Sequence, residues 1–147
     1  MCGAAEGRAR VREMAGVRVI EQTIERCSGR RLGTSEGPSI FAIVYIVEGL
    51  EWGYGAGGRC IVKTGDVLTW HTSHSLGFEV IEPVRKVSFL FDADAIASLL
   101  PAPPNLCDMH VPAASALGPM FAGYFAGLVS QLDTMAPRYH ADAMAMT

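Results

Sequence analysis

The chain has 147 residues, of which 50% are hydrophobic and 18% charged, so its composition excludes a disordered chain and fits one compact domain. The net charge of −3 comes with no basic stripe, which argues against a nucleic-acid backbone as a direct partner. Four widely spaced cysteines and an N-terminus without a long apolar stretch indicate a reduced, cytoplasmic protein rather than a secreted one.

The first half of the chain predicts strands. Residues 1–16 resemble a flexible leader, Val17–Glu25 alternates like a first strand, and 26–38 is an Arg-, Gly- and Ser-rich loop. Ser39–Val47 is β-branched or aromatic and apolar on both faces, which predicts a strand that is buried on both sides. The alternation over 50–54 then predicts a half-buried strand.

Further short strands follow at regular intervals, separated by the turn sequences AGGR (56–59) and KTGD (63–66). They are Cys60–Val62, Val67–His71, Gly77–Ile81 and Arg85–Phe91. Strands about every ten residues that end in Gly or Pro are typical of a β-sandwich or barrel.

Helices are predicted after Phe91. Asp92 or Asp94 can cap a short helix over Ala93–Leu100. A longer helix is indicated by apolar residues at steps of three or four, namely Leu117, Phe121, Tyr124, Leu128, Leu132 and Met135. Pro137 ends this helix, and Tyr139–Thr147 begins what is predicted to be another.

The stretch 109–132 has no acidic or basic residue and is long enough to cross a bilayer, with Gly123 and Gly127 at GxxxG spacing. Pro112 and Pro119 interrupt it, however, and polar residues dilute it. We therefore predict a buried or interface helix and no membrane partner.

Several segments between Ile40 and Pro101 carry a family resemblance through their order and spacing. They are YIVEG (45–49), GGR (57–59), KTGD (63–66), WHTSHSLGFEV (70–80) and RKVSFLFDADAIASLLP (85–101). Together they resemble the N-terminal cupin-like domain of AraC-type transcription regulators. The resemblance implies a mainly β fold: a double-stranded β-helix (jelly-roll) barrel over about 17–91 and C-terminal α-helices over about 93–147, in one domain. His71 and the run His74-Ser75-Leu76 depart from the family's pattern.

The resemblance also implies a function: the domain senses a small organic effector, forms a homodimer, and has neither enzyme activity nor a cofactor. The family binds DNA through a C-terminal pair of helix-turn-helix motifs, which we expect this chain to lack. On that basis the chain itself does not bind DNA specifically.

The main alternative is a small metal-dependent cupin enzyme, such as a dioxygenase or isomerase. His71, His74 and Glu79 invite that reading. Aligned to the metal-binding cupin pattern, however, the ligand positions hold Leu76, Ala42 and residues 36–38, none of them a histidine. Alternation would also place His71 and His74 on opposite faces of a strand. We therefore predict no metal site.

Nucleophilic and phosphate-binding sites are not indicated either. No GxSxG elbow occurs, and Cys60 is predicted to be buried and inert. The glycines around 53–58 belong to a hairpin and precede no helix that could receive a phosphate.

Aromatic side chains are the better candidates for ligand binding. Trp52, Tyr54, Trp70 and Phe89 are predicted to line the mouth of the barrel. If they only fill the core, the chain is a ligand-free dimerisation domain. The dimer interface is predicted on the longer helix at Phe121, Tyr124, Leu128 and Leu132, where nearby glycines allow a partner helix to approach.

Overall fold

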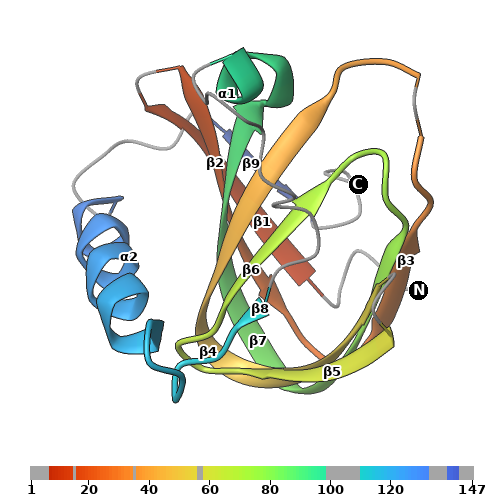
Figure 1. Cartoon of the computed structure of the whole chain (residues 1–147). Coiled ribbons are helices and arrows are strands. Elements are labelled where there is room, and N and C mark those ends of the chain that lie inside the picture. The colour runs from red at the N-terminus through yellow and green to blue at the C-terminus, as the bar shows by residue number, and fades with distance from the viewer. Residues whose placement is uncertain are drawn as a thin grey trace.

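Two long strands form the centre of the fold, β4 (Ile40–Gly55) and β7 (Leu76–Asp92). In the computed structural model, which describes residues 7–14, 16–34, 36–55, 58–98, 110–132 and 139–142, these strands pair antiparallel along almost their whole lengths. Their register shifts between Ile46 and Glu51, and both strands curve strongly there (Figure 1).

The curvature divides the sheet into two layers. The other strands are β1 (Gly7–Met14), β2 (Val17–Ile24), β3 (Ser28–Arg31), β5 (Gly58–Lys63), β6 (Val67–His71), β8 (His110–Val111) and β9 (Tyr139–Asp142). The first layer has the order β8-β6-β4-β7-β2-β1-β9 and uses the first half of β4. The second layer has the order β5-β4-β7-β3 and uses the second half of β4. The layers enclose the barrel interior.

Gly49 makes the register shift possible. Its φ of +119° is a conformation that other residues rarely adopt. A Cβ added there would lie 2.5 Å from the Pro83 carbonyl oxygen and 2.7 Å from Val84 Cα, so β7 also needs the glycine for its close approach. The Gly49 backbone N–H donates to Thr64 Oγ1 at 3.1 Å, which ties the bulge to the KTGD turn.

The first half of β4 has side chains packed on both faces of the sheet, as predicted for Ser39–Val47. Val44 and Ile46 face the interior, where they pack with Val62 of the second layer. Tyr45 faces the other way, toward helix α2 (Gly118–Leu132).

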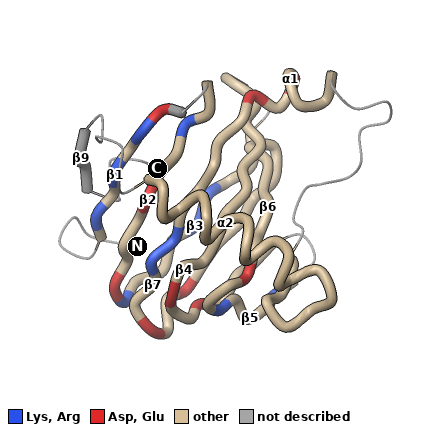
Figure 2. Tube along the Cα trace, turned by 90° about the vertical axis from the view of Figure 1, so that its left-hand side faces the viewer, with Lys and Arg blue, Asp and Glu red and all other residues tan. Residues whose placement is uncertain are grey.

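Helix α2 covers the outer face of the first layer (Figure 1). Phe125, Val129 and Leu132 are buried against the sheet, and the Phe125 ring lies 5.4 Å from that of Phe89. The helix carries no acidic or basic residue, whereas both signs are spread over the strands (Figure 2). The short helix α1 (Ala93–Ser98) begins as predicted at Asp92, whose Oδ1 accepts from the backbone N–H groups of Asp94 and Ala95.

Three sequence-based assignments need correction. Residues 7–14 of the expected leader form β1, because charged and small apolar residues alternate there and Ala9 and Val11 are buried. The predicted loop over 26–38 contains β3, which pairs with β7. Tyr139–Asp142, expected in a helix, is strand β9, because the edge of β1 offers it a backbone partner; 143–147 lie outside the described residues.

The role of Gly49 is testable by replacement with alanine. Gly49→Ala is expected to lower the free energy of unfolding by about 3 kcal/mol or more, because it adds a backbone clash to conformational strain. Gly58→Ala is the matched control, since Gly58 also has a positive φ (+103°) but its added Cβ meets nothing within 4 Å. Its expected cost is about 1 kcal/mol in urea unfolding. Equal losses would contradict the close-approach argument.

Candidate functional site

The four aromatic residues predicted to form one ligand site lie in three separate places. Trp70 is on the interior side of β6, packed with the Val44–Ile46–Val62 cluster. Phe89 is buried between the first layer and α2. Trp52 and Tyr54 stand on the outer face of the second layer, opposite Ile61 and Arg59 of β5. They therefore do not line one cavity.

The barrel interior instead contains an ion pair. The Lys86 ammonium donates to Glu51 Oε1 and Oε2 at 3.2 and 3.3 Å. Glu51 is 2% exposed and stands opposite Val62 and Val80, whose side chains belong to interior clusters. Lys86 Nζ also lies 4.7 Å from the centroid of the Phe78 ring, a cation–π contact that helps to hold the charge away from water.

A second polar group borders the interior at Trp70. The guanidinium carbon of Arg31 lies 4.4 Å from the centroid of the Trp70 ring. Arg31 also donates to the backbone carbonyl oxygens of His71, Thr72 and His74, at 3.2 to 3.3 Å, and so fixes the loop between β6 and β7. Trp70 is thus held in place by a cation and remains only half-buried.

Asp66, in the KTGD turn, connects the barrel to the segment before α2. Its fully buried carboxylate accepts from the Lys63 backbone N–H at 3.0 Å and from the Ala113 backbone N–H at 2.7 Å. His110 Nε2 lies 2.8 Å from its Oδ2. Sequence reasoning identified the turn but not this role, nor those of Glu51 and Lys86. The sequence signal that could have identified these residues is an isolated acidic or basic residue within an apolar strand.

The half-buried Cys60 is a poor nucleophile. Burial, and then the negative charges of Asp66 and Glu51, raise the pKa of its thiol, so it stays protonated at neutral pH. Cys60 was predicted to be buried and is only partly buried.

His71 does not form a catalytic pair with Ser39, although its Nε2 lies 3.0 Å from Ser39 Oγ. The Ser73 backbone N–H donates to His71 Nδ1 at 3.0 Å, which requires a lone pair on Nδ1. The neutral ring therefore carries its proton on Nε2 and cannot accept one from Ser39.

The histidines were expected on opposite faces of a strand, and this is wrong. β6 ends at His71, and the turn that follows brings the His71 and His74 rings to 6.3 Å between centroids. Glu79, the third residue of the alternative metal hypothesis, accepts a hydrogen bond from the Tyr54 hydroxyl. Within the described ranges, no three His, Cys, Asp or Glu side chains gather as a metal-ion site.

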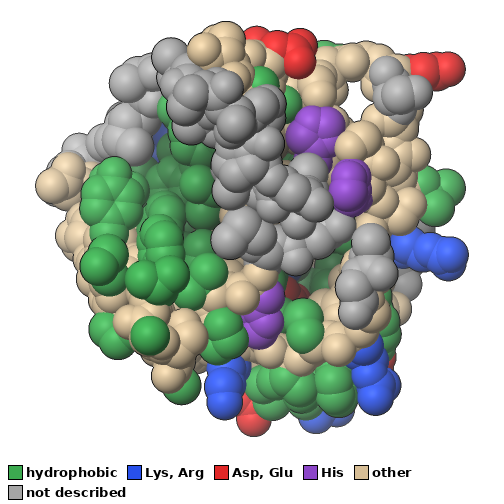
Figure 3. All heavy atoms as spheres, in the orientation of Figure 1, with side chains coloured by type: hydrophobic (Ala, Val, Ile, Leu, Met, Phe, Trp, Pro, Cys, Tyr) green, Lys and Arg blue, Asp and Glu red, His purple; other side chains and the backbone are tan. Residues whose placement is uncertain are grey.

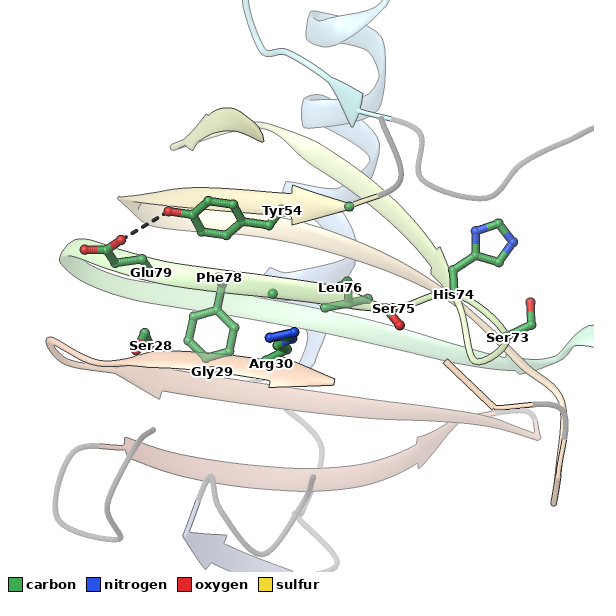
Figure 4. A pocket seen from close by; sticks show the side chains of 12 residues that line it. Ser28, Gly29, Arg30, Tyr54, Ser73, His74, Ser75, Leu76, Phe78 and Glu79 are labelled. Atoms are coloured by element: carbon green, nitrogen blue, oxygen red, sulfur yellow. Dashed lines mark hydrogen bonds between the residues drawn. The ribbon is translucent and has the colours of Figure 1, made fainter. Parts of the chain in front are cut away.

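A surface groove of about 700 Å³ lies on the second layer (Figure 4). We call it the outer groove; its lining includes Gly29, Arg30, Tyr54, Gly55, Gly77 and Glu79. Of the predicted ligand-binding residues, only Tyr54 lines it.

On the last helix, Leu132 is fully buried and Leu128 packs against the core, so these two predicted interface residues contact the chain's own barrel. Phe121 and Tyr124 are 36% and 64% exposed. In the part of the chain that the structure describes, no helix is long and apolar enough to cross a membrane.

Comparisons with known proteins bear on the fold. No family model and no curated protein matches the sequence. The AraC-like transcriptional activator CuxR superposes with a TM-score of 0.71 and 11% identity, over 88% of this chain and 48% of its own. A protein of unknown function, VPA0057 from Vibrio parahaemolyticus, gives a TM-score of 0.51 and 10% identity, over 60% of this chain and 90% of the other.

The fold is a cupin-like barrel. The mainly β class and the C-terminal helix α2 are thus confirmed. Identities near 10% establish the fold alone, and the chain spans about half (48%) of the activator's length.

The interior ion pair of the cupin-like barrel predicts a specific mutational pattern. Glu51→Gln leaves the Lys86 ammonium buried without a counter-charge and is expected to cost about 3 kcal/mol of unfolding free energy. The double variant Glu51→Leu with Lys86→Met removes both charges and is expected to cost less than the single one. Glu82→Gln, an exposed carboxylate on β7, is the control for urea unfolding. A double variant at least as unstable as the single one would contradict the assignment.

Proposed function

We propose that this chain is the effector-sensing and dimerisation module of an AraC-type transcription regulator, which binds a small organic molecule inside the barrel. The polar interior carries the proposal: Glu51 and Lys86 form a charged pair where a purely structural core would be apolar. Trp70, half-buried under Arg31, offers an aromatic surface on the same side of the sheet. The overlay on an AraC-like activator supports the regulatory setting.

The proposed mechanism couples the interior to α2 through β4 and β6. Val44 and Ile46 face the effector side while Tyr45, between them, stacks 6.0 Å from Phe125 of α2. Asp66, in the turn that precedes β6, accepts a hydrogen bond from the segment that leads into α2. An effector that binds one arrangement of barrel and helix more tightly than another shifts their populations.

In this proposal the module works in the cytoplasm, has no enzyme chemistry and needs no cofactor. DNA is bound by a separate helix-turn-helix domain of the regulator.

Effector binding is testable by a thermal-shift screen of small organic acids, amines and aromatic compounds. A ligand of the native state raises the melting temperature by mass action. The shift should fall by at least about half in Trp70→Leu and in the Glu51→Leu with Lys86→Met double variant, and persist in Lys63→Ala, an exposed control.

Two outcomes would contradict this proposal. A melting temperature that falls with a chelator and recovers with one metal would support the metal-dependent cupin enzyme. No response to any compound, with Trp70→Leu indistinguishable from the parent chain, would favour a ligand-free dimerisation domain.

For the dimer interface we propose the exposed apolar side of α2. Leu117, Met120, Phe121 and Tyr124 are all at least 36% exposed and gather on one face (Figure 3). Cβ atoms added at Gly123 and Gly127 would meet nothing within 4 Å, so the backbone is open to a partner helix there.

This interface predicts that Tyr124→Asp weakens self-association by about tenfold or more, because it buries an unpaired charge in an apolar contact. Ala126→Asp places the same charge on the other exposed side of α2 and should leave self-association within about twofold. Sedimentation equilibrium measures the self-association of both variants and of the parent chain. A monomeric parent chain, or equal effects of both variants, would contradict the interface.

A further inference from the structure

The lining of the outer groove includes a glycine that lies between an arginine and a tyrosine. Gly77 on β7 stands directly opposite Arg30 on β3 and Tyr54 on β4. Because neighbouring strands lie about 4.8 Å apart, the backbones of Arg30 and Tyr54 are about 10 Å apart with no side chain between them. The result is a trough across Gly77, between Tyr54 and Arg30, which is part of the outer groove (Figure 4).

One wall of the trough is aromatic. A Cβ built on Gly77 would lie 3.8 Å from Tyr54 Cβ and Cδ2, so the tyrosine directly borders the glycine floor. The Tyr54 hydroxyl donates to Glu79 Oε2 at 3.2 Å, and this bond occupies the carboxylate at the end of the trough. A planar ring that lies on Gly77 can therefore pack against the Tyr54 side chain.

The other wall is cationic. Arg30 is exposed, and no carboxylate of the described residues lies within ion-pair distance of it. Arg59 adds a second guanidinium on the same face, 4.1 Å from the centroid of the Trp52 ring. Among the described residues that line the groove, Glu79 is the one carboxylate, so Arg30 and Arg59 together leave a net positive charge beside it. An unpaired guanidinium is a bidentate partner for a carboxylate.

We propose that the outer groove is a second ligand site, which binds a planar organic anion such as an aromatic carboxylate. The ring lies on Gly77 against Tyr54, and the anionic group pairs with Arg30. The two proposed sites use different polar residues, because Glu51 and Lys86 face the barrel interior whereas Arg30 and Tyr54 stand on the opposite face of the sheet. Phe78 lines the groove and also contacts Lys86, so it lies between the two sites.

The test is a titration of the isotope-labelled full chain with 2-naphthoate, followed by the backbone amide NMR signals. The signals of Gly77, Gly29 and Gly55 are expected to shift together. Arg30→Gln is expected to raise the Kd by about tenfold or more, through loss of a charge-assisted bidentate bond. Arg26→Gln, an exposed arginine outside the groove, should change it by less than about twofold.

Two related probes test the chemistry of the ligand. Cyclohexanecarboxylate lacks the planar ring and 2-naphthalenemethanol lacks the charge, so both are expected to bind more weakly than 2-naphthoate. Tyr54→Leu should weaken 2-naphthoate by about fivefold or more through loss of ring contact.

Failure of this proposal is distinguishable from failure of the effector proposal. If 2-naphthoate shifts the signals around Trp70 and Lys86 and is insensitive to Arg30→Gln, the groove is not its site, while binding inside the barrel gains support. If no signal moves at millimolar 2-naphthoate, the outer-groove proposal is wrong, whereas the proposal of an effector site inside the barrel is unaffected.

Discussion

The pairing of β4 with β7 across a register shift is the constraint on which the rest of this structure depends. Both strands pass through the shift, so the first half of β4 belongs to one layer and the second half to the other. The barrel interior exists because the layers are joined in this way. Gly49 supplies the left-handed backbone and the close approach to Val84 that the shift requires. A bulge of this kind moves each side chain that follows it in the strand to the opposite face of the sheet.

This change in side-chain direction decides which residues face the barrel interior and which face outward. Before the shift, the even-numbered residues Val44 and Ile46 face the interior; after it, the odd-numbered Glu51 does. The register between β4 and β7 shifts by one residue between the pair Ile46–Lys86 and the pair Glu51–Val80. Glu51 is thereby brought to Lys86 inside the barrel, while Tyr54 is turned to the outer groove. The proposed effector site and the proposed second site are therefore two consequences of one bulge.

The first layer connects the interior to α2 through single strands with two buried faces. On β4, Tyr45 contacts the aromatic cluster under α2 while its neighbours face the interior. Asp66 holds the turn before β6 against the segment that leads into α2. Its fully buried carboxylate accepts two backbone N–H groups and contacts His110, so it resists displacement. A change inside the barrel therefore has short, packed routes to the helix that carries the proposed dimer face.

The sequence by itself determined the local features of this protein: strands at regular spacing, the doubly buried stretch over 39–47, the cap at Asp92 and an apolar helix near 118–132, since each follows from local periodicity and turn chemistry. It misassigned β9, because this edge strand is stabilised by pairing with the distant β1. It also missed β1, whose short alternation of charged and small apolar residues pairs with the neighbouring β2. It also grouped Trp52, Tyr54, Trp70 and Phe89 in one site. Only the tertiary structure decided which face each one occupies, because a single extra residue in a bulge inverts the alternation of a strand and leaves no reliable mark in the sequence.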